Sequence, residues 1–352
     1  MNLETPLYDR YQALLAAEPK TRQRDAADKL GVSEAEIVSV LPHAKRLRLD
    51  DIAGLLGRFE SLGRVMALSR NAWAVHEKKG RYHKLQLSGK MGLALDPDGI
   101  DLRFFFTHWA YAFALESEQG EGKRRRAIEI YDTHGEAIQK VVMQEADHDD
   151  AWQALVAGFA TEATPLADPP AADPLTPEDA TEPFDAAGYE AAWLALRDVH
   201  HFHALTRRFG LSRRDAFARA PAGFTRQVSA NAAEILLRAA AGTGLPIMVF
   251  VGNRGIVQIH TGPVTKIERM GPWINVLDAD FNLHLFDAEV AEAWYVRRPI
   301  SDGVVTAVEL FDGKGGTIAT FFGKRHEGQP EDPQWAALAE SLPDAGGVAD
   351  VA

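Results

Sequence analysis

The sequence contains no cysteine among its 352 residues. This absence excludes a disulfide framework, a thiolate nucleophile, an iron–sulfur cluster and a zinc site built on cysteine ligands. A run of about 18 apolar residues, the length needed to span a bilayer, is also absent, and the amino end has no secretory signal pattern. These absences predict a soluble cytoplasmic protein without membrane insertion.

The sequence also has no excess of positive charge. The chain has 38 Lys and Arg against 50 Asp and Glu, which gives a formal net charge of −12. Because like charges repel over long range, this balance argues against non-specific binding to nucleic acid or to an anionic membrane. The side chains left for ligand or catalytic chemistry are mainly histidine, methionine, tyrosine and the carboxylates.

A segment rich in Pro, Ala and acidic residues divides the chain into two similar halves, and its lack of hydrophobic periodicity predicts a linker. Three stretches of the first half recur in order in the second: "KLGVS" as "RFGLS", "VMALSRNAWAVHEKKG" as "IMVFVGNRGIVQIHTG", and "AIEIYDTHGEAI" as "AVELFDGKGGTI". Their nearly constant offset indicates a tandem duplication. The predicted regions are an amino-terminal repeat at 1–159, a linker at 160–187, a second repeat at 188–328, and a short helix with a flexible tail at 329–352.

Each half begins with helical patterns and continues with strands. In the second half the helical patterns cover Tyr189 to Arg208, Arg213 to Ala220 and Ala232 to Ala241, and short β-rich runs follow from Gly244. The gaps between these runs have hairpin length, whereas parallel strands need long crossovers. The predicted fold class is therefore α+β, with helices packed on an antiparallel sheet in each half.

Three histidines lie within four positions of "RDVHHFHALTRRFG" in the second half. On one continuous helix, Leu196, His200, His203 and Arg207 would share a stripe beside an apolar face. The aligned positions of the first half carry Thr and Arg, so the common fold does not require these histidines. Solvated histidines, a metal site and a haem ligand are all open interpretations. Zinc needs three or four ligands, whereas haem needs one axial imidazole, apolar walls and cations for its propionates.

Longer motifs favour one of these interpretations. The second half contains "DVHHF", "FGLSRRDAF", "GNRGIVQIHTGPV", "GPWINVLDADFNLHL", "AEAWYVRRPISDGVVTAVELFD" and "FFGKRHEGQPE", and the first half contains "VMALSRNAWAVHEKKGRYHKL" and "DLRFFFTHWAYAF". In this order they resemble the bacterial hemin-degrading and hemin-trafficking proteins of the HemS/ChuX type. The resemblance covers nearly the whole chain apart from the linker and tail. It implies a duplicated α+β fold that binds ferric haem in the cytoplasm after import.

The resemblance also implies roles for individual residues. His200 would be the axial ligand of the haem iron, with His203 as an alternative, and Arg103 would lie on the opposite side of the iron. Arg103 and His200 are then the candidate catalytic residues. The further pocket positions are two aromatic rings and three cations, of which the last two would hold the propionates: Phe105, Phe250, Arg213, Arg298 and Arg325.

Two activities are compatible with such a pocket. The protein would serve haem uptake and iron acquisition either by degrading haem with oxygen and a reductant, or by delivering it unchanged, so the sequence does not decide whether it is an enzyme. No flavin or nicotinamide fingerprint follows a strand, so the electron donor is not identified. A haem-uptake transporter and a downstream haem oxygenase are the candidate partners.

A transcriptional role is the third alternative. The segment from Thr21 resembles a helix-turn-helix with Gly31 in the turn, but the second helix begins with the acidic "SEAEIVSV" rather than with base-reading donors. We therefore expect a packing unit here and no DNA binding. His76 is expected as a surface histidine at a strand end, and the tryptophans of the strand patterns are expected in the core: Trp73, Trp109, Trp273 and Trp294.

Overall fold

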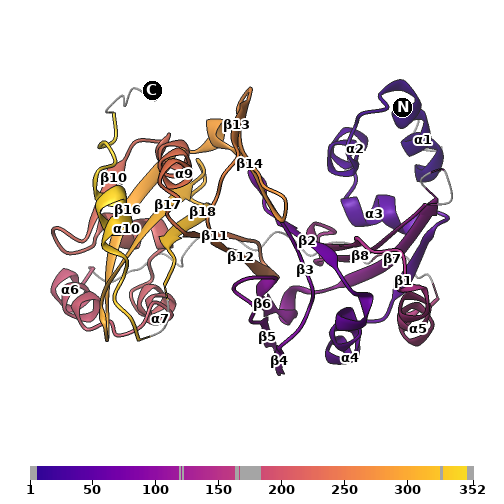
Figure 1. Ribbon diagram of the computed structural model, residues 1–352, viewed down its shortest axis with the longest axis horizontal. Helices are drawn as coiled ribbons and strands as arrows, with labels where there is room; N and C mark the ends of the chain where they lie inside the picture. Colours follow the sequence, from indigo (N-terminus) through magenta and orange to yellow (C-terminus); the bar gives the residue numbers. More distant parts are fainter. Residues whose placement is uncertain are drawn as a thin grey trace. The chain divides into compact units, whose positions relative to one another are not determined.

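The computed structural model describes residues 6–118, 120, 123–162, 166, 184–325 and 328–346 (Figure 1). Most of the predicted linker, at 163–165 and 167–183, lies outside the described residues, as does the end of the predicted tail. The chain forms two compact units. Unit 1 comprises Met1–Arg70, Glu77–Asp173 and Asn253–Gln258, and unit 2 comprises Asn71–His76, Pro174–Gly252 and Ile259–Ala352. The division falls within strands β3 (Ala74–Gly80) and β12 (Ile256–Gly262).

Unit 1 contains an antiparallel sheet in the order β1-β7-β8-β9-β2 and a hairpin-linked trio β4-β5-β6. Its strands are β1 (Ala44–Leu47), β2 (Val65–Arg70), β4 (Leu85–Ser88), β5 (Met91–Ala94), β6 (Asp101–Phe105), β7 (Tyr111–Glu118), β8 (Arg124–Tyr131) and β9 (Ala137–Met143). Its helices are α1 (Leu7–Ala17), α2 (Gln23–Leu30), α3 (Glu34–Ser39), α4 (Ile52–Gly57) and α5 (Asp149–Phe159), with short 3₁₀ helices at Phe59–Leu62 and Phe106–His108.

Unit 2 repeats this plan with the sheet order β10-β16-β17-β18-β11 and the trio β13-β14-β15. Its strands are β10 (Thr225–Val228), β11 (Ile247–Gly252), β13 (Ile267–Met270), β14 (Trp273–Leu277), β15 (Phe281–Phe286), β16 (Glu292–Ile300), β17 (Gly303–Phe311) and β18 (Thr317–Gly323). Its helices are α6 (Ala186–Leu194), α7 (His201–Arg208), α8 (Arg213–Ala218), α9 (Ala232–Thr243) and α10 (Pro333–Glu340), with a 3₁₀ helix at Asp287–Glu289. The matching strand orders confirm the predicted duplicated α+β fold.

Helix α9 and strand β11 illustrate how the sequence pattern builds the core of unit 2. Leu236, Leu237 and Ala240 are buried on one face of α9, as the helical period requires. Val249 and Val251 are buried on β11 and alternate with half-buried residues. These side chains pack in one cluster together with residues of β17, β18 and α10. No helix in the described part of the chain combines the length and apolar composition that crossing a membrane requires.

The predicted helix from Tyr189 to Arg208 is wrong in one respect, because it is two helices, α6 and α7, separated at residues 195–200. The Asp198 carboxylate accepts a hydrogen bond from the backbone N–H of His200 at 2.8 Å. Such a local side-chain bond competes with helix formation. The predicted stripe of Leu196, His200, His203 and Arg207 therefore does not run along one helix, because only His203 and Arg207 lie within α7. The apolar face of α7 is confirmed by the buried Phe202.

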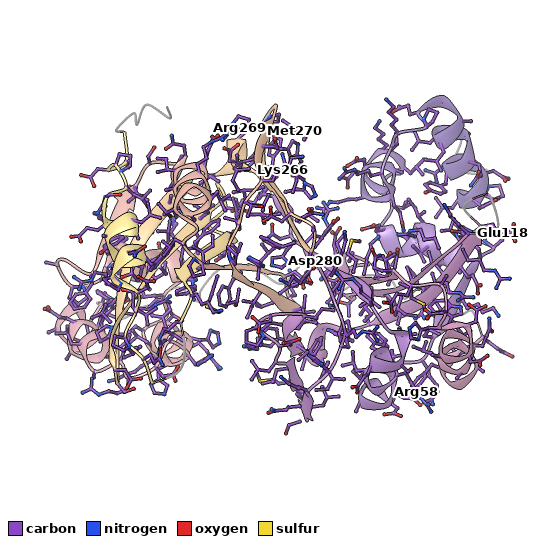
Figure 2. All side chains as sticks on the ribbon, in the orientation of Figure 1. Arg58, Glu118, Lys266, Arg269, Met270 and Asp280 are labelled. Atoms are coloured by element: carbon purple, nitrogen blue, oxygen red, sulfur yellow. The ribbon has the colours of Figure 1, made fainter. Side chains whose placement is uncertain are left out.

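Two short strands, β10 and β13, were not predicted by the sequence pattern. Each has four residues and is largely polar, so neither shows a hydrophobic alternation of useful length. Strand β13 forms a hairpin with β14, and Arg269 and Met270 lie at its tip (Figure 2). The predicted strands of the second half and the helix near the carboxyl end are confirmed.

His76 corrects another expectation. It is fully buried in β3 rather than exposed at a strand end, and its ring centroid lies 4.9 Å from that of Phe281. Three successive residues at the start of β3 are buried, so the alternation that predicted an outward face does not hold here. Trp109 and Trp294 are buried as expected, while Trp73 and Trp273 are half-buried.

The helix pair α2–α3 is a packing unit, as predicted. Gly31 ends α2 at φ +66°, which favours glycine, and Ser33 caps α3 in a reciprocal capping box with Glu36. Glu34, at the start of α3, is buried and hydrogen bonded to Lys140. The start of this helix is thus engaged within the protein.

We predict that Ser33→Ala lowers the free energy of unfolding by about 1 kcal/mol, because the backbone N–H of Glu36 at the start of α3 loses its capping partner. Urea denaturation at pH 7 measures this change. Ser39→Ala, at the exposed end of the same helix, is the control and should change stability by less than about 0.5 kcal/mol. Equal effects at the two positions would contradict the capping role.

Candidate functional site

His200 stands directly before α7, and its side chain is 84% exposed. Its ring Nδ1 lies 2.6 Å from Oδ1 of Asp198, the same oxygen that accepts from the His200 backbone N–H. The backbone N–H is the main reason why the pKa of Asp198 lies below its ordinary value. Because Asp198 engages Nδ1, the ring nitrogen left for an external ligand is Nε2.

A buried ionic group lies beside α7, and we call Glu309, Arg213, Arg298 and Phe202 together the Glu309 cluster. Glu309 on β17 has no exposed surface. The Arg213 guanidinium binds it with Nε and one terminal nitrogen, at 2.5 and 2.7 Å, and Arg298 on β16 adds a contact of 3.2 Å. The side chain of Arg298 is 2% exposed and that of Arg213 is 37% exposed. Arg213 is therefore the cation of this cluster that reaches the surface.

Phe202 connects the cluster to α7. The guanidinium carbons of Arg213 and Arg298 lie 5.1 and 5.2 Å from the centre of its ring, within the range of cation–π contacts. Arg298 also lies 5.7 Å from the ring of Phe322, which packs edge-on against Phe250 at 5.1 Å. Unit 2 thus brings predicted residues Arg213, Arg298 and Phe250 into one chain of contacts that leads to the helix begun by His200.

The cluster carries a net positive charge, because two guanidiniums face one carboxylate. Burial lowers the pKa of Arg298 to about 10, although the negative charge of Glu309 acts to raise it. Burial alone would raise the pKa of Glu309, but Arg213 and Arg298 outweigh it and hold that pKa below its ordinary value. All three groups are charged at neutral pH, so the site favours anions.

Two arginine nitrogens of unit 2 are buried without a hydrogen-bond acceptor among the described residues. They are Nε of Arg298 and Nε of Arg325, the latter on a half-buried side chain just after β18. Buried donors are almost always hydrogen bonded in native proteins. We therefore expect these two donors to bind an acceptor that is not part of the protein. A carboxylate ligand would provide one.

The lowered pKa of Glu309 predicts acid sensitivity. Its ionised form stabilises the folded state above about pH 4.5, its ordinary value, and this contribution is lost as pH falls through the lower folded-state pKa. We expect the free energy of unfolding to fall more steeply below pH 4.5 in the wild type than in Glu309→Gln. Guanidinium denaturation at pH 7, 5 and 4 measures both slopes, and parallel pH dependences would contradict the assignment.

Arg103 and Phe105 lie on β6 of unit 1. They are half-buried and alternate with the buried Leu102 and Phe104, as predicted from the period of a strand. Arg103 pairs with the buried carboxylate of Asp101 and donates to the carbonyl of Leu102 at 3.0 Å. The other predicted residues, including the exposed alternative ligand His203, belong to unit 2. Within unit 2, Phe202 and Phe322 join Arg213, Arg298 and Phe250, a set of contacts that includes neither Arg325 nor His203, and Arg103 pairs within unit 1.

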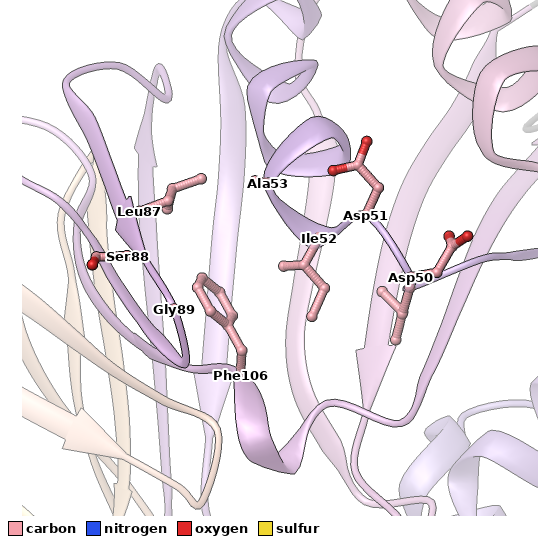
Figure 3. A pocket seen from close by; sticks show the side chains of 9 residues that line it. Asp50, Asp51, Ile52, Ala53, Leu87, Ser88, Gly89 and Phe106 are labelled. Atoms are coloured by element: carbon pink, nitrogen blue, oxygen red, sulfur yellow. The ribbon is translucent and has the colours of Figure 1, made fainter.

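Two cavities were not anticipated, and both lie in unit 1. One, of about 290 Å³, lies between the loop that leads into α4 and the β4–β5 hairpin, with Phe106 on its wall (Figure 3). The other, of about 490 Å³, lies between the α2–α3 turn and the β8–β9 turn. None of the predicted site residues lines either cavity. Both linings include acidic side chains and neither includes Lys or Arg, which does not suit an anionic ligand.

The prediction from sequence missed Glu309, Phe202 and Phe322. Glu309 had a signal, since it is a charged residue within the apolar run "AVELFD" and the same Glu recurs in the first half as Glu129. A carboxylate in the middle of a buried strand requires a buried cation. The two phenylalanines had no signal that set them apart from ordinary core residues.

Comparisons with known proteins identify the family and several similar proteins. Residues 31–159 and 210–342 each match the family described as the haemin-degrading HemS.ChuX domain. The chain is 41% identical to the hemin transport protein HmuS of Yersinia pestis over 336 residues, which are 95% of this chain and 96% of that protein. Its structure is similar to holo-PhuS, a heme-binding protein from Pseudomonas aeruginosa, with 43% identity, a TM-score of 0.91 and coverage of 96% of this chain and 98% of that one. It is also similar to the heme degrading enzyme ChuS of Escherichia coli O157:H7, with 38% identity, a TM-score of 0.87 and the same coverage.

Proposed function

The chain belongs to the haemin-degrading HemS/ChuX domain family, and on that premise we propose that it binds haem in unit 2 and serves haem uptake for iron acquisition. The observation that carries this proposal is the contact of Phe202, on the helix that follows His200, with Arg213 and Arg298, of which Arg298 is buried and has an unsatisfied Nε donor. An imidazole suits the iron, guanidiniums suit the propionates, and phenyl rings suit the macrocycle.

Each group of the site has a task in this proposal. His200 is the axial ligand through Nε2, because Asp198 holds Nδ1 and fixes the tautomer. Arg213, Arg298 and Arg325 hold the propionates, and Phe250 covers the ring. When bound, haem supplies the redox chemistry of its iron.

Arg103 and Phe105 of unit 1 complete the proposed set. Arg103 is the second candidate catalytic residue, since a half-buried guanidinium that is held by Asp101 is a fixed hydrogen-bond donor. His203 is exposed on α7 and is the alternative axial ligand. We propose the cytoplasm as the site of action, with a haem-uptake transporter and a downstream haem oxygenase as partners.

Degradation and delivery are distinguished by one experiment. The haem-loaded protein is incubated with ascorbate and oxygen, with and without catalase, and the products are separated by chromatography. Loss of the Soret band that persists with catalase and gives a defined ring-opened product would establish degradation. A stable Soret band together with transfer of haem to an apo-haem acceptor would establish delivery, and bleaching that catalase abolishes would indicate only damage by peroxide.

A further inference from the structure

The binding of an anion in this site does not require the negative charge of Glu309. Its two oxygens occupy the Nε edge of the Arg213 guanidinium and also contact Arg298. A guanidinium has two edges that can donate a pair of hydrogen bonds to a carboxylate, and the Nε edge is one of them. The described protein therefore already holds one carboxylate on the arginine pair that the proposed function assigns to propionates.

The duplication shows that this arrangement is particular to unit 2. Glu129 of unit 1 aligns with Glu309, but it bonds to the Tyr131 hydroxyl at 2.5 Å and lies 3.3 Å from Nζ of Lys140. The position that aligns with Arg213 is the buried Glu34, which also pairs with Lys140. In unit 1 a lysine, Lys140, thus pairs with both carboxylates. Both repeats keep the carboxylate, and only unit 2 surrounds it with two arginines.

We propose that Glu309 sets the haem affinity of unit 2, by neutralising one of the two positive charges of the arginine pair and competing with a propionate for Arg213. This inference rests on the proposed function. A fixed internal carboxylate lowers the attraction of the pair for an external one, because like charges at short range in a buried site repel strongly. The consequence is weaker binding and easier release, which suits a protein that passes its ligand on.

Glu309→Gln tests the proposal, because it removes the charge and keeps the shape of the side chain. Optical titration with hemin at the Soret band should show binding about tenfold tighter than in the wild type, the equivalent of one charge-assisted hydrogen bond. Hemin should also raise the Tm of this variant more than that of the wild type, since a propionate replaces the missing counter-ion.

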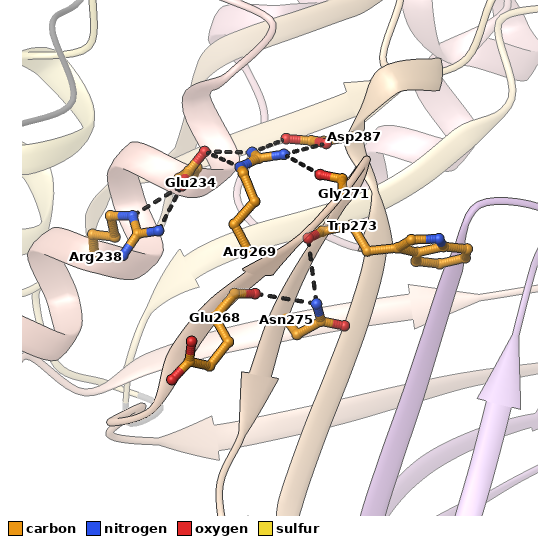
Figure 4. A network of polar contacts seen from close by, with 8 residues as sticks. All are labelled: Glu234, Arg238, Glu268, Arg269, Gly271, Trp273, Asn275 and Asp287. Atoms are coloured by element: carbon orange, nitrogen blue, oxygen red, sulfur yellow. Dashed lines mark hydrogen bonds and ion pairs between the residues drawn. The ribbon is translucent and has the colours of Figure 1, made fainter.

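Glu234→Gln is the matched control. Glu234 on α9 is also buried and pairs with two arginines, Arg238 at 2.8 Å and Arg269, in a separate network of unit 2 that includes Asp287 (Figure 4). The control loses the same kind of contact away from the proposed site. Its hemin affinity should equal that of the wild type, and a gain equal to that of Glu309→Gln would overturn the proposal.

Hemin dimethyl ester, whose propionates are uncharged, separates charge competition from an effect on the fold. The advantage of Glu309→Gln over the wild type should disappear with the ester. Should Glu309→Gln fail to fold, Glu309→Asp keeps the charge but cannot reach both arginines, and we expect a gain of about threefold that the ester abolishes.

The outcomes also separate this inference from the proposed function. Unchanged or weaker hemin binding in Glu309→Gln, or a gain that persists with the ester, would overturn the role of Glu309 alone, provided that the wild type binds hemin. Failure of the wild type to bind hemin would overturn the proposed function itself.

Discussion

His200→Ala is expected to lose the axial imidazole and to weaken hemin binding by at least about 100-fold, since loss even of groups that only orient a metal ligand costs 10–100-fold. The Soret band of any residual complex should shift and broaden. His200 is 84% exposed and precedes α7, so the substitution removes no packed side chain. The free energy of unfolding of the ligand-free protein should therefore stay within about 0.5 kcal/mol of the wild type.

His203→Ala is the matched control for this result. His203 is an exposed histidine three residues away on the same segment, with the same chemistry. It should leave the Soret titration unchanged. Should His203→Ala lose the axial ligation and His200→Ala keep it, His203 would be the ligand in place of His200.

Arg213→Ala is expected to lower the free energy of unfolding by about 3–5 kcal/mol, the cost of removing one partner of a buried ion pair. Glu309 would keep a single contact of 3.2 Å to Arg298, and the face of Phe202 would lose one of its two guanidiniums. Guanidinium denaturation measures the loss. Hemin binding should also weaken, because the cation that reaches the surface has been removed.

Arg269→Ala provides the comparison for Arg213→Ala. Arg269 binds Glu234 and Asp287 in the same unit, at the tip of the β13–β14 hairpin, and its side chain is 35% exposed, close to the 37% of Arg213. The carboxylates of Glu234 and Asp287 are less completely buried than that of Glu309. We therefore expect Arg269→Ala to lower the free energy of unfolding by about 1–2 kcal/mol without an effect on hemin binding. A loss at Arg213 no greater than that at Arg269 would show that the Glu309 cluster contributes no more than a surface network.

Local patterns predicted much of the fold. The alternation of "DLRFFF" predicts Arg103 and Phe105 on one face of a strand and Leu102, Phe104 and Phe106 on the other. Within β6 this alternation is confirmed, because a strand's period depends only on the chain itself, whereas Phe106 begins a 3₁₀ helix. The helix break before α7 was not predicted, since it depends on a competing hydrogen bond that the His200 backbone N–H donates to the Asp198 carboxylate. The hydrophobic period of a sequence carries no information about such a bond.

The site was predicted less completely than the fold, for a physical reason. Arg213 and Arg298 were identified through resemblance, but their common partner Glu309 lies 96 residues from Arg213 in sequence. Strand pairing and helix docking bring these groups together, and no local pattern encodes that proximity. His76 failed for a related reason, because its burial depends on packing against Phe281.

Stoichiometric titration of the wild type with ferric hemin, followed at the Soret band, tests the central claim most directly. A haem site in unit 2, with no matching histidine or arginine pair in unit 1, predicts a saturable transition with a single break at one equivalent. A titration without saturation would contradict haem binding, and two equal breaks would contradict a single site built on the histidine and arginines of unit 2.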